Sequence, residues 1–134
     1  MKEGWYNDDH LILFNEAEVL SASDRYGISN VLPGFQIIGL RGWDDFLVRD
    51  DKGSVFTVPT LPLDAKYLAP FSLPSAEISL QEDSRFAGKI KWYLTPVVFG
   101  GDPKSGENIY WVNHDLHAQL VRWWNDKYRA IVGG

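Results

Sequence analysis

Two histidines near the C-terminal end, His114 and His117, are the one pair of histidines spaced to bind a single metal ion. In a helix, residues three positions apart lie on similar sides, so both imidazole rings could contact the same ion. A metal site usually needs a third ligand and supporting hydrogen bonds. Asp115 and Asp126 are nearby carboxylates. The one remaining histidine, His10, is far away in the sequence. A metal-dependent enzyme that uses His114 and His117 is therefore the less favoured interpretation, and helix capping is the favoured one.

Two pairs of adjacent aspartates, Asp44–Asp45 and Asp50–Asp51, stand at the two ends of a short apolar run. Paired carboxylates can act as acid and base when their environments separate the two pKa values. Aspartate is also favoured in turns, where its carboxylate accepts backbone hydrogen bonds. Turn chemistry accounts for both pairs without catalysis, and an acidic patch that binds a partner is the second interpretation.

The sequence contains no recognisable nucleophile constellation. It has no cysteine, which excludes disulfides, thiolate zinc sites and a cysteine nucleophile. It lacks the G-x-S-x-G elbow of serine hydrolases. The glycine-rich loop at residues 100–106 lacks the residue order of a phosphate loop, so a hairpin loop is expected there. We therefore expect a protein that is not an enzyme and that needs neither a metal nor a cofactor.

Composition limits the possible partners. The chain has 134 residues, which fits one domain, and a formal net charge of −5. Nucleic-acid binding needs clustered Lys and Arg, so an acidic domain is a poor candidate for it. An acidic surface could instead steer a basic protein partner, and solubility alone is the other interpretation of the charge. No run approaches the roughly 20 apolar residues of a membrane helix, and no signal-peptide pattern is present. We expect a cytoplasmic protein without membrane contact.

The segment from residue 35 to residue 59 predicts a central three-strand meander. The first two apolar runs are separated by the glycine-containing residues 39–42, and the last two by the polar residues 50–53. Glycine and aspartate at such positions indicate tight turns. Pro59 ends the third run, because proline cannot donate a hydrogen bond to a neighbouring strand. Further strands are expected at residues 10–14 and 108–112, and one or two strands at residues 90–99, with Pro96 at an edge or bend.

Two helices are expected, at residues 15–25 and 114–131. Asn15 and Glu18 form a near-capping box, and Gly27 supplies a C-terminal stop. Asn113 is the expected cap of the second helix. The predicted inward residues of the first helix are Val19, Leu20 and Tyr26. Those of the second are Leu116, Leu120, Trp124 and Ile131, joined by Val121 and Tyr128. Residues 75–88 are polar and are expected to be the most mobile.

These elements predict an α+β fold in one domain, residues 1–134, with a mainly antiparallel or mixed sheet. Residues 89–134 are expected to be a C-terminal strand–helix extension that completes the domain. Exposed Trp beside Asp and Arg is typical of an interface hot spot, and Trp43 occupies such a position in a turn. The predicted partner-binding residues are Arg41, Trp43, Asp44, Asp45, Asp50 and Asp51.

The order of features from Leu11 to Phe71 resembles the SUKH superfamily, the small α+β domains of the Smi/Knr type. The resemblance covers about half of the chain. The C-terminal segment lies outside it, and the chain has few residues before the first strand, where members usually carry helices. The residues that carry the resemblance are Pro33, Gly34, Phe35, Ile37, Gly39, Gly42, Phe46, Asp50, Gly53, Val55, Val58 and Pro59.

Many members of this superfamily are immunity proteins of bacterial toxin systems, and they have no common catalytic residues. The resemblance therefore implies a protein that binds and neutralises a cognate toxin, often a basic nuclease, in the cytoplasm. A regulatory or scaffolding module is the alternative, because fold alone does not fix function.

Overall fold

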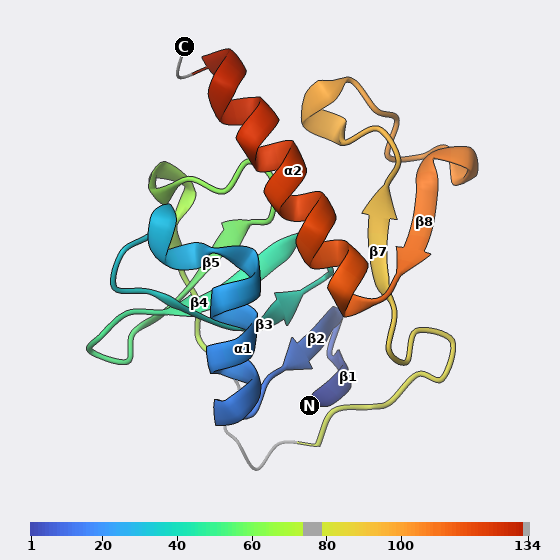
Figure 1. The fold of residues 1–134 in the computed structure, drawn as a ribbon. Helices are drawn as coiled ribbons and strands as arrows, with labels where there is room; N and C mark the ends of the chain where they lie inside the picture. The colour runs from blue at the N-terminus through green and yellow to red at the C-terminus, as the bar shows by residue number, and fades with distance from the viewer. Residues whose placement is uncertain (74–78, 133–134) are drawn as a thin grey trace.

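The computed structural model describes residues 1–73 and 79–132 and has an α+β architecture (Figure 1). Within these residues, six strands form one antiparallel sheet in the order β1-β2-β3-β4-β5-β6, and β7 pairs with β8 in a separate hairpin. The strands of the sheet are β1 Lys2–Tyr6, β2 Asp9–Leu13, β3 Gln36–Arg41, β4 Asp45–Arg49, β5 Val55–Pro59 and β6 Ala69–Pro70.

The predicted meander is confirmed, since β3, β4 and β5 are neighbours and antiparallel. The strand expected at residues 10–14 corresponds to β2. Sequence analysis missed β1, whose residues include Lys2, Glu3 and Gly4 and so show little strand pattern. The expected turn at residues 39–42 is misplaced: β3 continues to Arg41.

Gly39 lies inside β3 rather than in a turn, because the backbone of β2 passes close to it. A Cβ atom at Gly39 would lie 2.1 Å from the carbonyl oxygen of Ile12. The register between β3 and β4 shifts between Ile37 and Gly39. This bulge brings Ile37 and Leu40 to the same side of the sheet, where both belong to the main core cluster.

Helix α1, Glu16–Tyr26, begins and ends as predicted. The Asn15 side chain accepts a hydrogen bond from the Glu18 amide, and the Glu18 carboxylate accepts one from the Asn15 amide, each at 2.9 Å. Gly27 has a φ of 65°, the left-handed conformation of a helix end. One inward assignment is wrong, since the side chain of Leu20 is 65% exposed.

Helix α2, His114–Val132, is capped by Asn113, whose side-chain oxygen accepts a hydrogen bond from the Leu116 amide at 2.8 Å. The predicted inward stripe of α2 is wrong at both ends, because Leu116 is 43% exposed and Ile131 is 64% exposed. The buried residues of this helix are His117, Ala118, Val121 and Asn125. The inward face of α2 therefore includes two polar side chains, His117 and Asn125, which a hydropathy pattern assigns to the outer face.

The two helices cover one face of the sheet (Figure 1). The main core cluster combines Tyr26 of α1 and Val121 of α2 with sheet residues such as Phe46 and Val58. A second cluster on the other face includes Leu11, Ile38 and Leu47, against which Phe71 and Leu80 pack. Phe71 and Leu80 therefore cover part of this face, and Val19 of α1 also belongs to the cluster.

The stretch expected to be most mobile is only partly described, and residues 75–78 lie outside the described residues. Beyond them, Gln81 pairs with Trp5 of β1 through two backbone hydrogen bonds of 2.8 and 2.9 Å. The Trp5 indole also donates a hydrogen bond to Asp83 at 3.1 Å. These contacts attach the described part of the stretch to the edge of the sheet.

The C-terminal hairpin consists of β7, Ile90–Tyr93, and β8, Ile109–Val112. The strand expected at residues 90–99 ends at Tyr93, and a short 3-10 helix, Val97–Phe99, follows Pro96. Residues 100–106 lie in the hairpin connection, as predicted. Ile90, Trp92 and Val112 belong to the main core cluster, so the hairpin packs with the rest of the domain. No helix in the described ranges is long and apolar enough to cross a membrane.

Candidate functional site

An open cleft with a volume of about 350 Å³ lies between the sheet and the C-terminal hairpin. Its acidic side is the turn between β3 and β4, and its opposite side is β7 with the 3-10 helix that follows. The loop after β5 completes it. On the rim, Val97 is 48% exposed and Val98 is 44% exposed. The lining combines Asp44, Asp45 and Lys91 with apolar groups that include Tyr93, Pro59 and Pro96.

Hydrogen bonds fix the loop that follows β5. The Thr60 amide donates a hydrogen bond to the carbonyl oxygen of Asp44 at 2.9 Å. The buried Asn125 side chain of α2 donates to the Thr60 carbonyl at 2.7 Å and accepts from the Leu63 amide at 2.8 Å. Asn125 also donates to the Val121 carbonyl at 2.8 Å. One side chain of α2 thus holds the loop that forms part of the cleft wall.

Asp44 and Asp45 are the unusual charges of the cleft. Among the described residues, neither carboxylate forms a hydrogen bond or an ion pair. Partial burial raises the pKa of Asp44, with Lys91 opposing this effect and Asp45 adding to it. Burial also raises the pKa of Asp45, and Arg41 opposes it. Asp44 remains exposed and Asp45 is half-buried, so the loss of hydration is partial in both cases.

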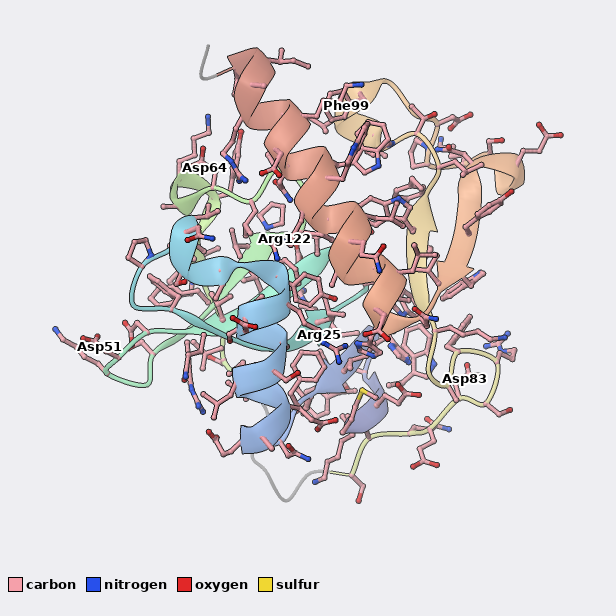
Figure 2. All side chains as sticks on the ribbon, in the orientation of Figure 1. Arg25, Asp51, Asp64, Asp83, Phe99 and Arg122 are labelled. Carbon is pink, nitrogen blue, oxygen red and sulfur yellow. The ribbon has the colours of Figure 1, made fainter. Side chains whose placement is uncertain are left out.

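The second predicted pair of aspartates lies elsewhere. Asp50 follows the opposite end of β4, roughly 15 Å along the strand from Asp45. Its carboxylate accepts hydrogen bonds from the Lys52 and Ser54 amides at 3.0 and 2.9 Å, which is the turn role that the sequence suggested. Asp51 lies at the far tip of the β4–β5 hairpin (Figure 2). The structure therefore divides the six predicted partner-binding residues into two separate groups.

Trp43 belongs to an aromatic cluster that closes the end of the sheet. Its ring stacks on His10 with 4.5 Å between ring centroids and meets Trp5, Phe86 and Trp111 edge-on. The indole Nε1 is buried and has no partner among the described residues. Trp43 also has a φ of 63°, which is unusual for a residue other than glycine. Its ring is thus a packing element, and only part of it reaches the surface.

Arg41, the remaining predicted residue, pairs with a neighbouring strand. Its Nε atom lies 3.1 Å from a carboxylate oxygen of Asp9 at the start of β2. Its guanidinium also lies 5.1 Å from the centroid of the Phe71 ring. Because Arg41 already has these partners, Asp44 and Asp45 are the predicted residues most available to a ligand in the cleft.

The histidine pair of α2 serves the packing of the two helices. His117 is 0% exposed, and its Nδ1 atom lies 2.6 Å from the Tyr26 hydroxyl of α1. Burial lowers the pKa of His117 to about 3, and it also lowers the pKa of His114. In residues 1–73 and 79–132, no group of three or more His, Cys, Asp or Glu side chains is arranged to hold a metal ion.

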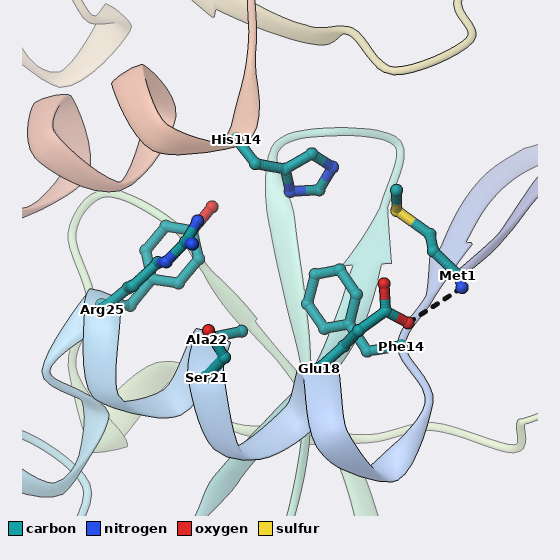
Figure 3. Close-up of a pocket in the computed structure, with 8 residues that line it drawn as sticks. Met1, Phe14, Glu18, Ser21, Ala22, Arg25 and His114 are labelled. Carbon is teal, nitrogen blue, oxygen red and sulfur yellow. Dashed lines mark ion pairs between the residues drawn. The ribbon is translucent and has the colours of Figure 1, made fainter.

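A second cavity of about 210 Å³ lies between α1 and the start of α2 (Figure 3). Glu18, Arg25 and His114 contribute its polar groups. Glu18 pairs with the amino group of Met1 at 2.9 Å, and Arg25 pairs with Asp115. Because both charged groups already have partners, this cavity offers less unmatched charge than the cleft at Asp44.

Sequence analysis identified the acidic side of the cleft and missed the other. Lys91, Tyr93, Pro96 and Val97 come from a segment far from Asp44 in the sequence, and they meet it only in the fold. The adjacent valines directly after Pro96 were the available signal, because proline interrupts a strand and so separates these apolar residues from it. The combination of unpaired carboxylates with an apolar wall suits a cationic group that also carries hydrocarbon.

Comparison with known proteins adds no relative, because no protein-family model, no curated protein and no solved structure matches the chain.

Proposed function

We propose that the protein is a non-catalytic binding protein of the immunity type, which binds and neutralises a basic bacterial toxin domain in the cytoplasm. The observation that carries the proposal is the cleft in which unpaired Asp44 and Asp45 face an apolar wall. Interfaces with such a combination use charge to speed encounter and apolar burial to slow release.

The resemblance to the SUKH superfamily supports the same proposal. Its elements are an initial strand, a helix and a three-strand meander, and these correspond to β2, α1 and β3–β5. Two of its glycines have clear structural roles: Gly39 admits the close approach of β2, and Gly53 has a φ of 84° in the β4–β5 turn. These residues support the fold pattern of the superfamily.

The surface around the cleft is suited to a protein partner. Val97 and Val98 lie on its rim, and Leu94, Tyr110 and Trp111 are further exposed apolar residues of the hairpin region. Exposed apolar groups beside charged ones are typical of a protein interface. The net charge of −5 favours encounter with a basic domain.

The proposal is tested by isolating the partner. The tagged protein is co-expressed with the products of its neighbouring genes, purified and examined by mass spectrometry. We expect one basic partner, toxic when expressed alone and harmless together with this protein. Recovery of a stable partner that is not toxic would replace the immunity function by that of a regulatory or scaffolding module. A metal-dependent catalytic activity that is lost when His114 is replaced by alanine would refute the non-catalytic proposal.

A further inference from the structure

We infer that the cleft at Asp44 and Asp45 is a receptor for a single arginine side chain of the protein partner. This inference deepens the proposed function and rests on it for the source of the arginine. The two carboxylates would receive the guanidinium, and the apolar wall formed by β7 and the following loop would receive its hydrocarbon stem.

The size of the cleft sets the scale of the ligand. Its volume of about 350 Å³ lies at the lower end of the range for ligand pockets, about 300–1,000 Å³. It is open to the surface, so the side chain can enter while its backbone stays outside. One long side chain fits this space better than a folded element such as a helix.

The charges of the cleft favour a cation. Asp44 and Asp45 are partly desolvated and have no hydrogen bond or ion pair among the described residues. Partial loss of hydration without a partner costs free energy, which a bound cation recovers. Lys91 is the one basic residue of the lining. Its ammonium lies over two aromatic rings, 5.3 Å from the ring centroid of Tyr93 and 5.9 Å from that of Trp43. The lining therefore keeps an excess of negative charge.

The walls favour arginine over a small inorganic cation. Pro59, Pro96 and Pro103 contribute apolar ring surface to the lining, which a small inorganic cation cannot use. Together with Val97 and Tyr93 they offer surface for a hydrocarbon stem. A guanidinium is planar, presents five N–H donors and stacks on aromatic rings, so it can serve two neighbouring carboxylates and pack on Tyr93.

The test uses a blocked arginine, N-acetyl-L-arginine amide, as the probe. Its neutral control is the corresponding blocked citrulline, which has the same shape without the charge. Amide and indole NMR signals of the ¹⁵N-labelled protein are followed during titration with each compound. We expect the arginine probe to shift signals of Thr60, Lys91 and the Trp92 indole, and to bind at least about tenfold more tightly than citrulline. Equal shifts by both compounds, or shifts that avoid the cleft, would overturn the inference.

Three variants make the test specific. Asp44→Asn and Asp45→Asn remove a carboxylate from the cleft and are expected to weaken arginine binding by about tenfold. Asp24→Asn makes the same change of charge on the exposed side of α1, where the carboxylate forms no hydrogen bond or ion pair with a described residue. This control should bind the probe as the parent protein does. Weakening of the same size in Asp24→Asn would assign the effect to overall charge and refute a receptor in the cleft.

The outcomes separate this inference from the proposed function. If a toxic partner is isolated and Asp44→Asn and Asp45→Asn bind it with unchanged affinity, the arginine receptor is refuted and the immunity function stands. If the arginine probe binds in the cleft but no toxic partner is found, the receptor stands and the immunity function fails.

Discussion

Stability of the protein should fall as the pH is lowered, because His117 is buried as a neutral side chain. This residue is 0% exposed, and burial lowers its pKa from 6.5 to about 3. Its Nδ1 atom lies 2.6 Å from the Tyr26 hydroxyl, which holds the ring between the two helices. The unfolded chain therefore binds a proton near neutral pH that the folded protein does not accept.

The size of the effect follows from the shift in pKa. Because the unfolded state binds more protons, the free energy of unfolding decreases by about 1.4 kcal/mol per pH unit below the unfolded pKa of about 6.5. Between about pH 7.5 and about pH 5, His117 alone should reduce it by about 2 kcal/mol. Burial also lowers the pKa of His10 and His114, which act in the same direction. The effect should end near pH 3, where folded His117 itself accepts a proton.

The assay is urea unfolding, followed by tryptophan fluorescence, at a series of pH values. The comparison is His117→Asn, which keeps an acceptor near the position of Nδ1 and cannot titrate. This variant should be less stable near neutral pH, and its slope between about pH 6.5 and about pH 5 should lose the share of His117 and keep that of His10 and His114. A parent protein whose stability is flat over this range, or a variant that keeps the full slope, would refute the assignment.

Three further substitutions test the contacts of the fold. Asn125→Ala leaves the Leu63 amide and the Thr60 carbonyl without their partner, so urea unfolding should show a loss of about 2–3 kcal/mol. Gly39→Ala would place a Cβ 2.1 Å from the Ile12 carbonyl, so thermal unfolding should show a loss of more than about 3 kcal/mol or an unfolded chain. Trp43→Ala removes the ring stacked on His10, so calorimetry should show a loss of about 3 kcal/mol even without a partner.

Two of these substitutions have a control variant. Gln119→Ala changes an exposed residue of α2 and should leave stability almost unchanged, in contrast to the buried amide. Gly106→Ala is the control for the glycine of β3, since no atom lies within 4 Å of its Cβ position. If the Trp43 variant is as stable as the parent protein, Trp43 is instead the exposed interface residue that the sequence predicted. If a substitution reduces the free energy of unfolding no more than its control does, the packing described above is contradicted.

Local signals in the sequence predicted the elements that depend on neighbouring residues. The capping box of Asn15 and Glu18 and the stop at Gly27 involve residues close in sequence, and the structure confirms them. The β4–β5 turn was likewise recognisable from Asp50 and Gly53. Gly39 was misassigned because the need for a residue without a side chain comes from Ile12 on another strand. No pattern among the sequence neighbours of Gly39 reveals this contact.

The inward face of α2 was misassigned for a similar reason. His117 and Asn125 are polar, yet both are buried, because Tyr26 supplies a hydrogen-bond partner to the first and the loop at Thr60 and Leu63 supplies partners to the second. A hydropathy pattern assigns such polar residues to the outer face of the helix. The predicted apolar stripe is therefore rotated away from the face that is buried. The cleft was half predicted, because Asp44 and Asp45 form a visible pair whereas their apolar wall comes from a distant segment.

The most direct test of the binding function is a growth assay in cells that express the toxic neighbouring gene product. We expect the parent protein and the Asp24→Asn control to restore growth. A double variant with Asp44→Asn and Asp45→Asn, folded to the same extent, should restore it poorly. Full protection by the double variant would contradict the role of the cleft. Failure of the parent protein to protect against any neighbouring gene product would contradict the immunity function itself.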